Sequence, residues 1–207
     1  MKNLVITVPR LEIHRPPVST AIIANCIKLA GHPVETLDLN CEFFHYLNNR
    51  DSYYAYDEVW DRARPITDAE TENLIKFIKQ VAFKKISNND RIFISVFGKA
   101  AHLFTTILCE LIRKNFKNKI IILGGAGVTS GEIGKFKQQF GIKMKKEGLC
   151  NLYVVGEGEN LVVDILNNNL DAPGIKNEIP AQLSNINDLP IPDYSFYDLD
   201  KYDYLSE

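Results

Sequence analysis

Two glycine-rich turns are the stretches of this sequence whose residue types and spacing could build a binding site. Residues 124–127 read Gly-Gly-Ala-Gly and directly follow the apolar run 119–123. Because glycine has no side chain, a ligand can approach the backbone closely at such a turn. The spacing is neither the G-x-G-x-x-G of dinucleotide-binding turns nor the G-K-[ST] of phosphate-binding loops. Taken alone, these glycines indicate a tight strand-to-helix turn as readily as a ligand site.

The second turn, residues 155–159, reads Val-Gly-Glu-Gly-Glu and again joins an apolar run to a helical pattern. Carboxylates in the first turn of a helix are favoured by the helix dipole, so these glutamates also have a purely structural explanation. Whether they belong to a site therefore depends on where the fold places this turn.

The four cysteines, Cys26, Cys41, Cys109 and Cys150, are widely scattered, with no C-x-x-C or C-x-x-x-C pair. This spacing argues against a disulfide framework and against a metal or iron–sulfur site built from this chain alone. No apolar run approaches the roughly 20 residues that cross a bilayer, and the first residues lack a signal-peptide pattern. The formal net charge of −2 gives no electrostatic reason to expect a nucleic acid. We expect a reduced, cytoplasmic protein with neither a membrane nor a nucleic-acid partner.

Apolar runs of strand length alternate with helical patterns along residues 1–170. The expected strands are residues 4–8, 34–39, 92–97, 119–123 and 152–155, and one of the intervening helices is expected around 133–140. This alternation predicts an α/β domain, a doubly wound five-stranded parallel sheet with right-handed crossovers. By analogy with flavodoxin-like and other Rossmann-like domains, we expect the strand order 2-1-3-4-5 and ligands at the carboxyl ends of the strands.

Two regions lie outside this alternation. Residues 41–66 are rich in aromatic side chains, which predicts a helical cap at the sheet edge, a wall over a ligand pocket or a docking face. Residues 171–207 are rich in proline and aspartate and have no periodicity, which is typical of a linker. Because this tail carries many aromatic residues, we expect it to pack along the outside of the α/β domain.

Taken together and in order, five segments carry a resemblance that none carries alone. They read PP-x8-CIKLAGHPVETLDLN, IFISVF, IIILGGAGVT, LYVVGEGE and DLPIPDYSFYDLDKY. This succession resembles the N-terminal cobalamin (vitamin B12)-binding domain of the cobalamin-dependent radical SAM proteins. Those domains show a Pro-rich loop, a Gly-Gly turn followed by a threonine, a V-x-G-E-G-E strand end and an L-P-x-P-D-Y linker into the radical SAM barrel. The match covers essentially the whole chain.

The resemblance implies that the ends of three strands bind cobalamin. The residues concerned are Ser95, Val96 and Phe97, then Gly124, Gly125, Ala126, Gly127 and Val128, and then Gly156, Glu157 and Gly158. The Gly-Gly turn would line the slot for the nucleotide tail of the cofactor, and the third strand would end beside the corrin or its tail. The parent protein would be a radical SAM enzyme, such as a methyltransferase in which cobalamin relays a methyl group.

The sequence departs from this family at two places. Classical cobalamin domains carry Asp-x-His-x-x-Gly after the first strand, and the histidine is the lower axial ligand of cobalt. Here residues 12–17 read Glu-Ile-His-Arg-Pro-Pro, so His14 is either a metal ligand or a solvated loop histidine. His102, after the third strand, is open to the same two interpretations. The C-x-x-x-C-x-x-C loop that holds the [4Fe–4S] cluster is absent, so we expect the cluster and S-adenosylmethionine only in a separate radical SAM domain, in cis or in trans.

Two other interpretations stay open at this point. A degenerate domain that has lost cobalamin could serve as a structural or docking module, which the altered Glu-x-His loop favours. A flavin- or nucleotide-binding flavodoxin-like protein would follow from the fold alone.

Overall fold

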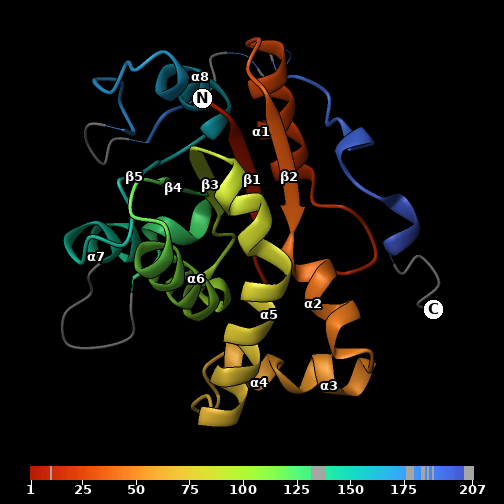
Figure 1. Ribbon diagram of the computed structural model, residues 1–207. Coiled ribbons are helices and arrows are strands. Elements are labelled where there is room, and N and C mark those ends of the chain that lie inside the picture. The colour runs from red at the N-terminus through yellow and green to blue at the C-terminus, as the bar shows by residue number, and fades with distance from the viewer. Residues whose placement is uncertain are drawn as a thin grey trace.

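The computed structural model describes residues 1–9, 11–131, 139–175, 180–182, 185, 187 and 189–202. Its centre is a five-stranded, all-parallel sheet with the strand order β2-β1-β3-β4-β5 (Figure 1). The strands are β1 (Asn3–Thr7), β2 (Val34–Asp38), β3 (Arg91–Ser95), β4 (Ile120–Gly124) and β5 (Leu152–Tyr153). The predicted parallel sheet and the expected strand order are both confirmed.

Helices cover both faces of the sheet, as in a doubly wound Rossmann-like domain (Figure 1). On one face lie α1 (Val18–Leu29) and α8 (Gly158–Leu166), which pack against each other and against a smaller apolar core. The other face carries the larger core, to which α5 (Asp68–Asn88), α6 (His102–Asn115) and α7 (Phe140–Lys146) contribute. The residues of β1, β3 and β4 therefore alternate between two cores, as strands buried on both faces do.

Pairing between the central strands places residues at corresponding positions next to one another, so that they form rows across the sheet. Val5 pairs with Phe93, which pairs with Ile122, and all three face α1 and α8. Two residues further along each strand, Thr7, Ser95 and Gly124 form the next row on the same face. Side-chain size falls along this second row from threonine to glycine, so the face is less filled toward β4.

The aromatic residues of 41–66 form a helical cap at the carboxyl end of β2. The cap consists of α2 (Leu39–Leu47), α3 (Arg50–Ala55) and α4 (Asp57–Trp60), which lie together at one end of the molecule (Figure 1). Phe43 lies at its centre, with its ring centroid 5.0 Å from those of both Tyr56 and Phe77. Phe43, Tyr53, Tyr56 and Trp60 are buried in the larger core. The expected cap is confirmed, and its outer side also forms part of the cleft described below.

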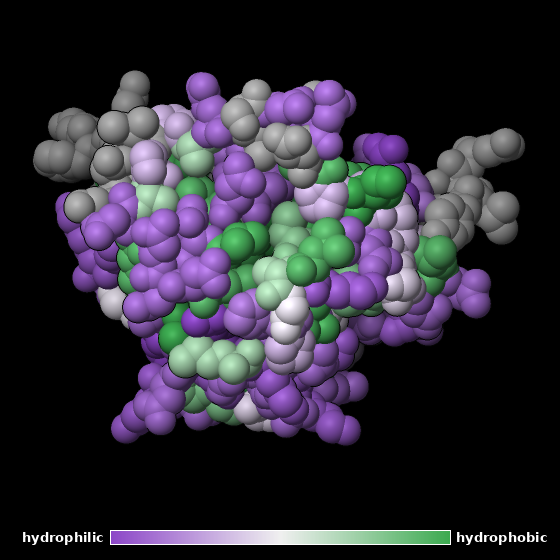
Figure 2. Space-filling model, turned by 90° about the horizontal axis from the view of Figure 1, so that it is seen from above, coloured by the Kyte–Doolittle hydropathy of each residue, from purple (hydrophilic) through white to green (hydrophobic). Residues whose placement is uncertain are grey.

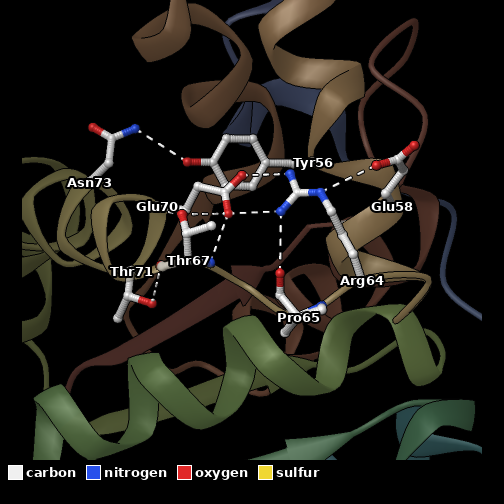
Figure 3. Close-up of polar contacts among 8 residues, drawn as sticks. All are labelled: Tyr56, Glu58, Arg64, Pro65, Thr67, Glu70, Thr71 and Asn73. Carbon is white, nitrogen blue, oxygen red and sulfur yellow. Dashed lines mark hydrogen bonds and ion pairs between the residues drawn. The ribbon is translucent and has the colours of Figure 1, made fainter.

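α5 begins with the capping box that Thr67 and Glu70 predict. Thr67 Oγ1 accepts the backbone N–H of Glu70 at 3.2 Å, and Glu70 Oε2 accepts the backbone N–H of Thr67 at 2.9 Å. Arg64 donates two further hydrogen bonds to the same carboxylate, at 2.9 and 2.6 Å (Figure 3). The bond from Arg64, with those from Thr67, lowers the pKa of Glu70 to about 2. This cluster fixes the end of the aromatic cap to the first turn of α5.

The described part of the C-terminal segment, residues 189–202, runs along α1 and the β2 edge of the sheet (Figure 1). Lys28 Nζ donates to Asp193 Oδ2 at 2.7 Å, and the Phe196 carbonyl accepts from Thr36 Oγ1 at 2.9 Å. Further along, Lys201 Nζ lies 2.6 Å from Glu42 Oε1. The expected packing along the outside is confirmed for these residues, whereas residues 203–207 lie outside the described part of the chain. We call residues 189–202 the strap.

The remaining expectations concern helix α7 and the surface. A helical segment was expected around residues 133–140, but residues 132–138 are not among those described, and α7 begins only at Phe140. In the described part of the chain, no helix is long and apolar enough to cross a membrane. Figure 2 views the end from which β2 starts, and hydrophilic residues cover most of that face. The hollows described next lie at the other end of the strands, where β2 leads into α2.

Candidate functional site

The site lies outside the carboxyl ends of β1 and β3, where the chain turns to opposite sides of the sheet. From β1 the chain crosses through α1 to β2, and it then returns through α5 to β3 on the other side of β1. Parallel α/β sheets bind ligands in the crevice at such a switch point. The described residues form two adjoining hollows here, a slot and an open cleft.

The slot is a cavity of about 210 Å³ between the sheet and the helices α1 and α8. Its apolar lining comes from three central strands, from the chain after β5 and from the two helices. These residues are Val5, Phe93, Ile94, Ile122, Val154, Ile23, Val162 and Ile165. Polar groups lie among the other lining residues, including Ser19, Thr20 and Ser95. An apolar interior with a few polar groups suits a flat, uncharged ring system.

Gly124 keeps the slot open at its β4 side. A Cβ atom built on Gly124 would meet nothing within 4 Å, so any larger side chain would project into free space beside the slot. Its neighbour Gly125 also lines the slot, but glycine is needed there for the turn, because of its φ of 99° and its close approach to Val96. A Cβ atom on Gly125 would lie 2.7 Å from the Val96 carbonyl oxygen. Of the two glycines, Gly124 is thus the one whose small size serves the cavity.

The rest of the Gly-Gly-Ala-Gly turn lies behind the slot. Gly127 donates its N–H to the Val96 carbonyl at 2.8 Å, and a Cβ atom on Gly127 would clash with Val96. His102 Nε2 donates to the Gly127 carbonyl at 2.9 Å. The His102 ring stacks on that of Phe140, with 3.9 Å between the ring centroids. His102 is therefore a buried structural histidine that supports the turn. Val96 and Val128 are buried, and Ala126 is exposed outside the slot lining.

The second turn contributes Gly156, Glu157 and Gly158 to the slot lining. The φ of Gly156 is 94°, and a Cβ atom there would clash with the Ala181 carbonyl oxygen. The Glu157 N–H donates to that same carbonyl at 3.0 Å, and Gly156 forms an isolated parallel bridge with Ala181. The glycine at 156 is thus required by the packing of the chain on itself.

The open cleft, of about 1030 Å³, adjoins the slot and shares Ser19 and Glu159 with it. Three segments surround it, namely the loop 11–18 after β1, residues 97–100 after β3, and the outer side of the aromatic cap. Several apolar side chains face this space while remaining exposed, with 61% of Phe97, 45% of Val18 and 42% of Tyr54 accessible to solvent. Such an apolar surface is typical of a ligand or partner contact.

His14 lines the open cleft and is half-buried. The acidic residue two positions before it, Glu12, pairs with Arg15, with 3.2 Å between Oε2 and Nη2. In the classical motif the corresponding carboxylate orients the histidine. Here the Glu12 carboxylate engages an exposed arginine of the same loop. Among the described residues, no group of three His, Cys, Asp or Glu side chains could hold a metal ion.

Two tyrosines of the strap reach polar groups next to these hollows. Tyr197 OH shares a hydrogen bond of 2.7 Å with Thr20 Oγ1, which in turn lies 2.9 Å from Thr7 Oγ1. Tyr202 OH donates to Asp38 Oδ2 at 2.8 Å. Because Thr20 lines the slot and Asp38 lines the cleft, the strap is directly bonded to a wall of each.

Asp38 is a buried carboxyl at the carboxyl end of β2. Its Oδ1 caps α2 by accepting the backbone N–H groups of Asn40 and Cys41, at 3.0 and 3.2 Å. Burial raises the pKa of Asp38 to about 6, although these bonds and that from Tyr202 act in the opposite direction. Burial and the neighbouring Asp38 likewise raise the pKa of Tyr202. The pair is therefore an uncharged tyrosine next to a carboxyl that takes up a proton more readily than an exposed one.

The sequence did not reveal several residues that form the slot. The floor residues Val5, Phe93 and Ile122 look like ordinary strand residues until the register places them in one row. Thr20 and Glu159 come from helices that are far apart in sequence and meet only in the fold. The available signals were Glu159 in the second glycine-rich turn and the small polar residues Ser19 and Thr20 near the start of the first helix.

Comparison with known proteins gives distant structural likenesses only. No protein-family model matches the chain, and no curated protein does. One similar solved structure is the radical S-adenosylmethionine methyltransferase TsrM from Kitasatospora setae with tryptophan substrate and a SAM analogue (aza-SAM) bound. It shares 14% identity with this chain at a TM-score of 0.46, over 84% of this chain and 28% of the enzyme. A second structure of TsrM, with cobalamin and a [4Fe–4S] cluster bound, shares 16% identity at a TM-score of 0.43, over 92% of this chain and 31% of the enzyme.

The chain thus spans less than a third of the length of the TsrM chain in either structure. At these TM-scores the likeness is too loose to support a function. The fold rests on the sheet order and the helix layers described above, and the site rests on the geometry of the slot and the cleft.

Proposed function

We propose that this chain is a cobalamin-binding domain, with the nucleotide tail of the cofactor in the slot and the corrin over the open cleft. The observation that carries the proposal is the junction of a narrow apolar slot with a broad, partly apolar cleft at the switch point of the sheet. Cobalamin has this same composite shape, a wide ring system with a flat base on a flexible arm. The succession of motifs along the sequence supports the same ligand.

The residues at the junction fit such a ligand. Gly124 leaves room beside the slot, and Ser95 and Ser19 place hydroxyl groups along its lining. Phe97 and the loop around Pro16 and Pro17 present apolar surface to the cleft. When bound, cobalamin supplies a cobalt centre that can carry a methyl group. The chain's own residues bind the cofactor and shield its base from water.

His14 is the candidate axial ligand of cobalt on this proposal, because it is the histidine that lines the open cleft. The alternative is a loop histidine that leaves the lower face of the cobalt to water. The visible spectrum of the bound cofactor, compared between the wild type and His14→Ala, separates the two, since the axial ligand tunes the electronic transitions of the metal. A shifted spectrum assigns the ligand to His14, and an identical one to water or an open face.

We further propose that the parent protein is a radical SAM enzyme, for example a methyltransferase, whose cluster and S-adenosylmethionine belong to a separate domain. The cysteines of this chain support that division, because all four are buried and they come from different segments of the fold. Burial raises the pKa of Cys26 and Cys150 to about 11, which disfavours the thiolate form that a cluster requires. Anaerobic reconstitution with iron and sulfide should therefore leave this chain without a stoichiometric cluster and without 5′-deoxyadenosine formation.

A docking module is the second candidate function, favoured by the exposed Phe97, Val18 and Tyr54 in the cleft. A flavin- or nucleotide-binding protein is a third candidate, which the fold alone suggests. To separate these functions, the purified chain is mixed with hydroxocobalamin or with FMN and passed over a gel-filtration column. Comigration of hydroxocobalamin alone supports the proposal, comigration of FMN alone favours the flavin binder, and comigration of neither favours the docking module.

A further inference from the structure

Glu159 lies where the slot opens into the cleft and lines both of them. It belongs to the first turn of α8, directly after the Gly158 that starts the helix. Its Oε2 atom is buried, and no group among the described residues lies within hydrogen-bond distance of it. The negative charge of Glu159 also contributes to the raised pKa of Cys26 on α1, second to burial. The carboxylate thus lies between the two helices that form the wall of the slot.

A buried carboxylate oxygen without a donor is unusual, because almost all buried polar atoms in folded proteins are hydrogen-bonded. The dipole of α8 favours a negative charge in the first helical turn, which explains an acidic residue at this position. The dipole does not explain why one oxygen is turned inward without a donor. The side chain is therefore placed for a donor that the described residues do not supply.

Glu157, two residues earlier, provides a contrast within the same turn. It is exposed, and its backbone N–H is already bonded to the Ala181 carbonyl at 3.0 Å. The sequence motif contains both glutamates, and the resemblance names only Glu157 as a site residue. The buried Oε2 atom of Glu159, at the junction of the two hollows, distinguishes them in the structure.

We propose that Glu159 selects the ligand by accepting a hydrogen bond from an uncharged donor, an amide N–H or a hydroxyl group, at the junction of the slot and the cleft. This inference rests on the proposed function and names the group that the site recognises. Cobalamin carries donors of both kinds, amide side chains around the corrin and a ribose hydroxyl on the nucleotide arm. An anionic group at the same place would be repelled by the carboxylate.

The test compares the dissociation constants of hydroxocobalamin for the wild type, Glu159→Ala and Glu159→Gln, with Asp164→Asn as a control on the same helix but outside both hollows. We expect Glu159→Ala to weaken binding roughly 10- to 100-fold, the range for a hydrogen bond to a charged acceptor. Glu159→Gln keeps an acceptor oxygen without the charge, so it should weaken binding only about fivefold. The Asp164→Asn control should bind as the wild type does.

Stability of the ligand-free chain distinguishes recognition from a purely structural role. If Glu159 awaits a ligand donor, removing its carboxylate relieves an unpaired buried oxygen but loses the helix-dipole stabilisation, so the denaturant midpoint of the ligand-free protein should change little. A side chain that only supports α8 would lower both the midpoint and the affinity. A lower midpoint in both Glu159 variants, with the control unaffected, would overturn the inference.

Cobinamide, which has the corrin amides but no nucleotide arm, identifies the donor. An equal loss for cobalamin and cobinamide in Glu159→Ala assigns the bond to a corrin amide, and a loss for cobalamin alone assigns it to the arm. A wild-type chain that binds neither compound refutes the proposed function itself. A wild type that binds, together with Glu159 variants of unchanged affinity, refutes only the role of Glu159.

Discussion

Gly124 and Gly125 are adjacent but meet different physical demands. A side chain on Gly124 would enter open space next to the slot, whereas one on Gly125 would meet the Val96 backbone. Gly125 also has a φ of 99°, a conformation that residues with a Cβ atom rarely adopt. The first position therefore affects the size of the slot and the second affects the folding of the turn.

Gly124→Leu should lower the affinity for hydroxocobalamin at least tenfold while changing the free energy of unfolding little, because its side chain fills the slot without a clash. Gly125→Ala should instead destabilise the chain by about 1–3 kcal/mol, the usual cost of a residue forced into a sparsely populated backbone region. Spectral titration and urea unfolding of both variants measure the two effects. Equal affinity of a folded Gly124→Leu chain would place the ligand elsewhere.

Asp38 should make the stability of the chain depend on pH in the direction opposite to that of most carboxyl groups. Its pKa is about 6 in the folded chain, compared with about 3.9 in an unfolded one, so the folded state holds the proton more tightly. Stability should therefore fall as the pH rises from about 4 to about 6, by on the order of 2 kcal/mol from this group.

Asp38→Asn keeps an effective capping residue for α2 and should lose this pH dependence. Urea unfolding between pH 4 and pH 7 measures it. Glu70 provides a separate window, since its pKa of about 2 lies below the unfolded value of about 4.3, and its contribution is lost only as the pH falls through that lower range. If the pH profiles of the wild type and Asp38→Asn were parallel, Asp38 would not be the group that titrates.

At the scale of elements, the features that the sequence predicts are those that depend on residues close together in the chain. Thr67 and Glu70, which are three residues apart, mark the start of α5, and Gly31, which has a φ of 81°, marks the end of α1. The slot, in contrast, depends on which residues share a row across three strands and on the meeting of α1 with α8. Such contacts are fixed by strand register and by packing between distant segments, so no local sequence pattern predicts them.

The order of the strands was expected by analogy with flavodoxin-like domains and did not follow from the alternation alone. Alternation of strands and helices restricts the topology to a few right-handed arrangements, and one of these has the observed order. The sequence motifs singled out Gly156 and Gly127 as turn residues. Only the fold shows why glycine is required at these positions, namely the close contacts with Ala181 and Val96.

The capping box should contribute measurably to the stability of the element that follows it. Thr67→Ala removes the acceptor for the Glu70 N–H and should lower the free energy of unfolding by about 1 kcal/mol. Thr71→Ala is a suitable control, because its hydroxyl donates to the Thr67 carbonyl outside the box. Urea unfolding followed by circular dichroism measures both variants, and equal stability of Thr67→Ala and the wild type would show that Arg64 and Glu70 hold the turn without it.

At the scale of the whole molecule, the C-terminal region contacts both edges of the sheet. Ala181 forms an isolated parallel bridge with Gly156 in the chain that follows β5, and the strap lies along β2 at the opposite edge. Unprotected edge strands are templates for pairing with other chains, and coverage of this kind reduces that risk. The same region binds Thr20 and Asp38, so it connects the edges of the sheet to the walls of the site.

The strap also bears on the order in which the chain folds. Its side-chain hydrogen bonds join residues 156 to 177 positions apart, so they close very long loops of the chain. Contacts of such long range are expected to form after the rate-limiting step, when the sheet and the slot already exist. Tyr197→Phe and Tyr202→Phe should therefore accelerate unfolding and leave the folding rate nearly unchanged, as stopped-flow measurements can show. A newly made chain would then offer its ligand an assembled slot before the strap closes over α1, and the cofactor could load during that interval.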